Sequence, residues 1–111
     1  MPVKDSLESF ECSKNPYRDF GFRNPEQALV KSTLAMHIQD AMEARGLTQR
    51  EAAELMGIDQ AKVSAIVNGN LKGFAIERLM RFLNALDIDV EIQLRHKPKT
   101  NAHAQTRVTS I

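Results

Sequence analysis

Residues 47–68, LTQREAAELMGIDQAKVSAIVN, constrain the fold of this chain most, because they carry the start, end and turn signals of two consecutive helices. Thr48 followed three residues later by Glu51 is the capping box of a helix start. Gly57 stands where a helix C-terminus favours a residue with positive φ, and Asp59 can cap a second helix. We therefore predict two short helices joined by a tight turn.

The apolar residues of this stretch recur at helical spacing. They predict one inward stripe on each helix and an apolar plug in the turn: Ala52, Leu55 and Met56 on the first helix, Ile58 in the turn, and Val63, Ile66 and Val67 on the second. Ala53 is small enough to let two crossing helices approach closely. Together these features form a helix-turn-helix pattern.

Several positions match a known family: Gln49, Ala53, Gly57, Ile58, Val63, Ser64, Ile66 and the pair Asn68-Gly69. The stretch resembles the XRE (Cro/CI-like) helix-turn-helix family. The flanking sequences SKNPYRDFGF and GFAIERLMRFLNALDIDVEIQL extend the similarity from about residue 13 to residue 94, and resemble the HigA-type antitoxin branch. Stand-alone regulators share these flanks. The resemblance implies a λ-repressor-like domain that binds double-stranded DNA, and the branch implies a RelE-type toxin as partner.

Two further helices should flank the motif. Asn24 is a preferred N-cap and Pro25 suits the first helical position, so we expect a long helix from there to about Arg45, ended by Gly46. Its apolar stripe is Leu34, Ile38, Ala41 and Met42, broadened by Ala28, Leu29 and Ala35. Residues 74–87 predict an amphipathic helix with Ile76, Leu79, Met80, Leu83 and Leu86 on one face. Arg78 and Arg81 lie off this face and are expected to be solvated.

From residue 88 onward, apolar residues recur at every second position instead of at helical spacing. Ile88, Val90, Ile92 and Leu94 alternate with polar residues, which predicts a strand. We find no second strand of similar quality, so antiparallel pairing with the same strand of a second copy is the simplest arrangement. Pairing with an extended piece of the N-terminal segment is the alternative. The expected fold class is mainly α: a λ-repressor-like helix-turn-helix helical domain with one C-terminal β-strand that pairs across a dimer.

Length and composition set the domain organisation. The 111 residues, 42% of them hydrophobic, suffice for one small domain, which we place at residues 23–95. Residues 1–22 are expected to be a partly disordered N-terminal segment, and residues 96–111 a disordered basic tail. Cys12 is the only cysteine, and no apolar run approaches the length of a signal or membrane-spanning segment. A cytoplasmic protein is expected.

The second helix of the motif should present its outward face to a major groove. On a helical wheel this face is formed by Gln60, Ala61, Lys62, Ser64, Ala65 and Asn68. Gln60 can bond adenine bidentately, Ser64 can donate or accept, and Lys62 can bond guanine or phosphate. The alanines allow close approach to a thymine methyl. Alternatively, this is a solvent face that happens to be small and polar.

Phosphate contacts are expected beside this face. Gln49 matches a family position that holds the DNA backbone, and Arg50 and Lys72 are further candidates. The formal net charge is only +1, so DNA binding must depend on local charge. Between Arg45 and Phe82 there are six basic and four acidic residues, which predicts moderate affinity per monomer.

The N-terminal segment carries three aromatic residues that are costly to leave in water: Tyr17, Phe20 and Phe22. They predict either a loop pinned onto the helical core or a docking surface for another protein, the candidate toxin-binding site.

No motif for catalysis, a metal or a cofactor is present, since the three histidines are scattered and no Gly-rich phosphate loop exists. We do not expect an enzyme. The predicted function is a sequence-specific repressor that binds an inverted-repeat operator as a homodimer, and that is the antitoxin of a type II toxin-antitoxin pair autoregulating its operon. The alternatives are a stand-alone XRE-family regulator without a toxin, and a protein-binding neutraliser that does not recognise DNA.

Overall fold

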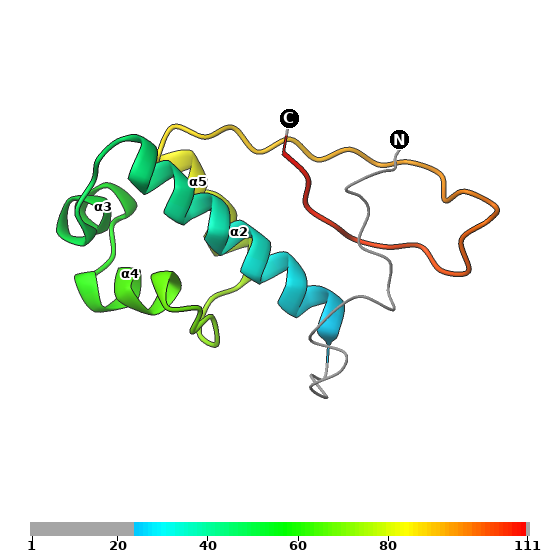
Figure 1. Ribbon diagram of the computed structural model, residues 1–111, viewed down its shortest axis with the longest axis horizontal. Coiled ribbons are helices and arrows are strands. Elements are labelled where there is room, and N and C mark those ends of the chain that lie inside the picture. The colour runs from blue at the N-terminus through cyan, green and yellow to red at the C-terminus, as the bar shows by residue number, and fades with distance from the viewer. Residues whose placement is uncertain (1–23, 111) are drawn as a thin grey trace.

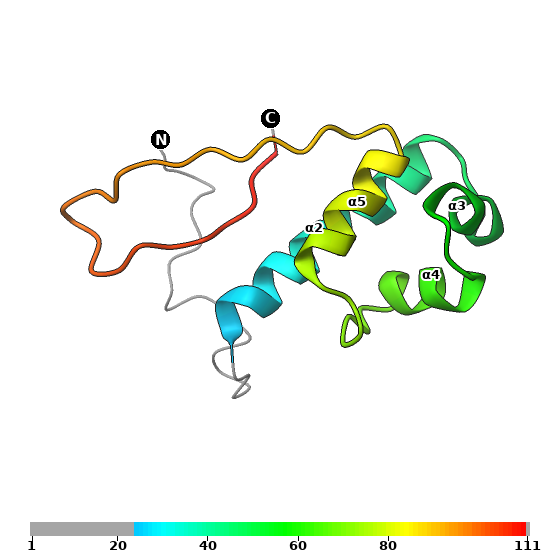
Figure 2. The same ribbon diagram turned by 180° about the vertical axis from the view of Figure 1, so that it is seen from behind.

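The computed structural model describes residues 24–110, and in this part of the chain it contains helices and no strand (Figure 1). The helices are α2 (Pro25–Ala44), α3 (Gln49–Met56), α4 (Gln60–Val67) and α5 (Ile76–Ala85). The long α2 packs along α5, and the short α3 and α4 pack on each other and on the α2–α5 pair. Figures 1 and 2 show α3 and α4 together at one end of the molecule.

The long helix begins and ends where the sequence predicts. The Oδ1 atom of Asn24 accepts a hydrogen bond from the Gln27 amide at 3.1 Å, and Pro25 occupies the first helical position. The helix ends at Ala44, and Gly46 has a φ of 64°, a conformation that glycine adopts at little cost.

Both short helices have the predicted caps. The Thr48 side chain accepts a hydrogen bond from the Glu51 amide at 3.1 Å, while the Glu51 carboxylate accepts one from the Thr48 amide at 2.9 Å. Gly57 ends α3 with a φ of 72°, and the Asp59 carboxylate accepts a hydrogen bond from the Lys62 amide at 2.9 Å. The hydrogen bonds from the Thr48 and Lys62 amides lower the pKa of the Glu51 and Asp59 carboxyls, respectively.

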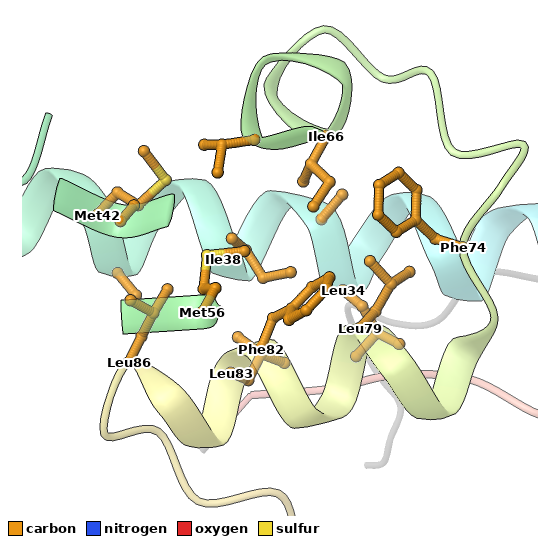
Figure 3. Packing of buried hydrophobic residues seen from close by; sticks show 14 of the residues in the cluster. Leu34, Ile38, Met42, Met56, Ile66, Phe74, Leu79, Phe82, Leu83 and Leu86 are labelled. Atoms are coloured by element: carbon orange, nitrogen blue, oxygen red, sulfur yellow. The ribbon is translucent and has the colours of Figure 1, made fainter. Parts of the chain in front are cut away.

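The four helices of residues 24–110 all contribute to one hydrophobic core (Figure 3). Its most enclosed large side chains are Ile38 of α2, Val63 and Ile66 of α4, Leu79 of α5, and Leu86 just after α5. Phe74 and Phe82 meet edge to face, with ring centroids 6.1 Å apart. Ala53 is also buried, as expected of a small residue where the helices approach each other.

Two predictions about side-chain placement are wrong. Leu55 is 45% exposed, whereas it was expected in the inward stripe of α3. The buried residues of that helix are Ala52, Ala53 and Met56, and Leu55 lies about 100° around the helix from the centre of the face they form. Arg78 is half-buried instead of solvated, because its guanidinium lies 5.3 Å from the ring centroid of Phe74 and 5.5 Å from that of Phe82.

Residues 88–95, the predicted strand, extend away from the end of α5 without strand pairing in the described chain (Figure 1). Asp87 has a φ of 66°, and this left-handed backbone conformation turns the chain outward. The Asp87 carboxylate lies 3.6 Å from the Arg45 guanidinium. A strand needs a partner to satisfy its backbone groups, and the pairing of this segment across a dimer stays a prediction. The alternative pairing with the N-terminal segment lies outside the described residues.

The fold predicts that the α3 cap contributes to stability. Thr48→Ala removes the side-chain acceptor for the Glu51 amide and should lower the free energy of unfolding by about 1 kcal/mol. Urea unfolding followed by circular dichroism measures this change. Thr100→Ala, an exposed threonine that caps no helix, is the matched control. Equal stability of the two variants would contradict a stabilising role for the cap.

Candidate nucleic-acid interface

The surface of α4 divides into a buried and an exposed side. Val63 and Ile66 are buried in the core, whereas Gln60, Ala61 and Lys62 in the first turn and Asn68 after the last are exposed. The first turn of α4 therefore presents three consecutive side chains to solvent, where they are available to base edges.

The middle of α4 is less exposed than its ends. Ser64 and Ala65 are half-buried, and Ala65 packs against the hydrophobic core. The Ser64 hydroxyl accepts a hydrogen bond from the Asn68 side-chain amide at 3.3 Å. This bond orients both side chains along the helix. It leaves the side-chain carbonyl oxygen (Oδ1) of Asn68 available as an acceptor.

Lys62 has a local partner. Its ammonium lies 3.4 Å from the Asp59 carboxylate, an exposed pair that contributes little to stability and that a phosphate or guanine edge can replace. The same aspartate caps α4, so it remains at the N-terminus of this helix. Lys62 therefore offsets a fixed negative charge at this helix start.

The predicted phosphate contacts lie on two separate segments. Gln49, half-buried, and Arg50, exposed, are the first two residues of α3, and Lys72 is exposed in the loop between α4 and α5. Glu51 occupies the same helix start, and its amide is bonded to Thr48. The α3 amides left free of the cap are consequently those of Gln49 and Arg50, and they lie beside a carboxylate that would repel phosphate.

Ion pairs neutralise most of the other charges in this region. Glu77 bonds Arg81 at 2.9 Å, Arg45 faces Asp87, and Asp59 faces Lys62. Within residues 24–110, Arg50 and Lys72 have no ion pair. These two cations, on either side of α4 in the sequence, thus carry the unpaired positive charge nearest to it along the chain.

Arg78 is the basic residue whose ordered position sequence reasoning missed. Its signal was present, because Phe74, Arg78 and Phe82 follow one another at intervals of four residues, although Phe74 itself precedes α5. The two rings hold the guanidinium against α5, so Arg78 covers the core with its side chain.

The remaining predicted residues lie elsewhere. Val90 is half-buried against the core, whereas Ile88, Ile92 and Leu94 are exposed, the last by 92%. Tyr17, Phe20 and Phe22 lie outside the described residues. Residues 24–110 contain no group of His, Cys, Asp and Glu able to hold a metal ion, and none of their helices is long and apolar enough to span a membrane.

Comparison with known proteins agrees with this arrangement. A family model described as "Helix-turn-helix domain" matches residues 16–95. A solved structure described as "Putative XRE Family Transcriptional Regulator" is similar with a TM-score of 0.76 and 43% sequence identity, over 79% of this chain and 99% of that one. No curated protein matches the chain. With the capped α3–α4 pair and the family match over most of its length, the protein belongs to the XRE family of helix-turn-helix proteins.

Proposed function

We propose that this protein is a DNA-binding transcriptional regulator that recognises its operator with α4. The observation that carries the proposal is the exposure of Gln60, Ala61 and Lys62 in the first turn of a helix whose opposite side, Val63 and Ile66, is anchored in the core. A recognition helix of this motif contacts base edges with its N-terminal residues. The similarity to a protein described as a transcriptional regulator supports the same function.

The charges of the domain favour moderate affinity for each copy. Arg50 and Lys72 supply unpaired cations, and the acidic caps Glu51 and Asp59 oppose phosphate at both helix starts. A regulator of this kind gains affinity and specificity by placing two recognition helices on one operator. We therefore propose that a homodimer binds an inverted-repeat operator and represses transcription from it.

Residues 88–94 are the proposed dimer interface. Ile92 is 73% exposed and Leu94 92% exposed, and they alternate with the polar Glu91 and Gln93. An apolar stripe on an unpaired extended segment favours pairing with an identical segment, which satisfies the backbone and buries the stripe. Antiparallel pairing has two-fold symmetry, as an inverted-repeat operator requires.

A second candidate function is that of an antitoxin bound to a RelE-type toxin, with repression of its own operon. The resemblance to the HigA-type branch and the three aromatic residues of the N-terminal segment support it. Toxin binding through residues 1–22 would leave the exposed turn of α4 free for DNA. The competing functions are regulation without a toxin and neutralisation without DNA recognition.

Base recognition by α4 predicts different effects for its glutamine and for the loop lysine. Gln60→Ala should reduce operator affinity by about tenfold with little loss on random DNA, because a bidentate base contact is worth about 1–3 kcal/mol. Lys72→Ala should weaken binding to both DNAs similarly, since phosphate contacts carry no sequence information. Fluorescence anisotropy at fixed salt measures both. An equal loss on operator and random DNA for Gln60→Ala would contradict base recognition.

The strand interface predicts that Ile92→Pro yields monomers. Proline removes a backbone donor from the proposed ladder, and Ile92 is exposed, so the core should be unaffected. Sedimentation equilibrium gives the molecular mass. Ala102→Pro, at an exposed position in the tail, is the control and should remain dimeric. A dimeric Ile92→Pro variant would place the interface elsewhere.

The antitoxin function predicts that deleting residues 1–22 abolishes binding to a toxin while operator binding persists. The test protein is the product of a small basic open reading frame next to the gene, and co-purification with the tagged chain is the measurement. A truncated chain that remains folded and still co-purifies would exclude the N-terminal segment as the toxin site. A chain that unfolds would show that Tyr17, Phe20 and Phe22 are core residues.

A further inference from the structure

The C-terminal tail returns to the beginning of α2 (Figures 1 and 2). The Thr106 amide donates a hydrogen bond to the Glu26 carboxylate at 3.0 Å, joining residues eighty positions apart. Val108 packs against the hydrophobic core, and it is the only side chain between residues 91 and 110 that is not exposed. We call residues 106–108 the clasp.

A hydrogen-bonded reversal directs the tail back toward α2. The Asn101 amide donates to the carbonyl of Pro98 at 3.0 Å, which closes a four-residue turn. The Lys97 ammonium donates to the Asn101 carbonyl at 2.7 Å and to that of Pro98 at 3.3 Å. The outgoing and returning parts of the tail are thus joined by a defined turn.

The clasp lies over a small pocket on the first half of α2. The helix contributes Leu29, Val30 and Thr33, and the tail contributes Thr106, Arg107 and Val108. The Thr33 hydroxyl donates to the Leu29 carbonyl at 2.8 Å, so it needs no partner from the tail. The surface offered to the clasp is therefore apolar, with a single carboxylate, that of Glu26, to one side.

This surface has the chemistry of a site for an extended peptide. It combines an acceptor for one backbone amide with an apolar surface for the side chain two residues later, and residues two apart in an extended chain share a face. Val108 is β-branched and suits an extended backbone. These contacts select backbone conformation and side-chain shape, and they make no use of the charge of Arg107.

We propose that the first half of α2 is a binding site for an extended peptide segment of a protein partner, and that the clasp occupies it as an internal competitor. The clasp belongs to the same chain as α2, and this connection sets an effective concentration of order millimolar. Its contacts with α2 include the hydrogen bond from Thr106 to Glu26 and the packing of Val108, and a partner segment that adds further contacts displaces it. This proposal requires neither DNA binding by α4 nor pairing of residues 88–94.

The test uses the full chain with Val108→Asp, which should open the site because a charge cannot pack against this apolar surface. The probe is a synthetic peptide of residues 102–110, titrated while the methyl signals of Leu29 and Val30 are followed by nuclear magnetic resonance. The variant should bind the peptide at least tenfold more tightly than the wild type, whose site is occupied. Thr109→Asp adds the same charge at an exposed neighbour and should behave as the wild type.

A substitution of Glu26 provides the second part of the experiment. Glu26→Gln in the Val108→Asp chain should weaken peptide binding several-fold, because the acceptor loses its charge, whereas Glu43→Gln at the other end of α2 should not. Should Val108→Asp lower the melting temperature markedly, Val108→Ala replaces it with the same readouts. Equal peptide binding by wild type and variant, or no binding by the opened chain, would overturn the proposal.

Discussion

Burial of α4 against α2 and α3 is the interaction on which the rest of this structure depends. A helix of eight residues is unstable alone, because the few hydrogen bonds it forms do not offset the cost of nucleating it. Val63 and Ile66 are anchored among Ile38, Leu79 and their neighbours, and this burial supplies the missing stability. The exposed side of α4 is thereby held in one orientation, as recognition of a rigid DNA groove requires.

If α4 recognises DNA as proposed, the same anchoring limits which of its side chains can reach the bases. Ala65 packs against the core and Ser64 is half-buried, so the exposed surface is concentrated in the first turn and at Asn68. Capping carboxylates stand at the starts of both α3 and α4, where they stabilise the helices and oppose phosphate. Helix stability and DNA affinity thus place opposite demands on these two positions, and pairing of two copies is one way to recover the affinity.

The surface outside the motif shows how one core supports several extended segments. The turn at Asp87 directs residues 88–95 away from α5, and the reversal at Pro98 brings the tail back to α2. Each segment has one half-buried valine against the core, Val90 on the outward path and Val108 on the return. Pairing of two copies would involve the beginning of this stretch, residues 88–94. Binding of a partner at α2 would displace its end, residues 106–108.

The sequence by itself determined the helices and the ends of the capped ones, because caps and turn residues act through contacts within four positions. The helix predicted at residues 74–87 has no side-chain cap and spans Ile76–Ala85. The capping box at Thr48, the glycine turn at Gly57 and the proline start at Pro25 all have the predicted geometry. The motif also sufficed to identify the family. The periodicity of apolar residues predicted the direction of most core side chains. It wrongly placed Leu55 in the core, because spacing alone does not say which side of a short helix packs against its neighbours.

Only the tertiary structure decided contacts between distant residues. The half-burial of Ala65 and the bond between Thr106 and Glu26 depend on how helices and tail meet in space. Such contacts leave weak traces in one sequence, because many residue pairs would satisfy the same local pattern. The physical reason is that capping is a local, directional hydrogen-bonding problem, whereas packing is a collective one that the whole chain solves together.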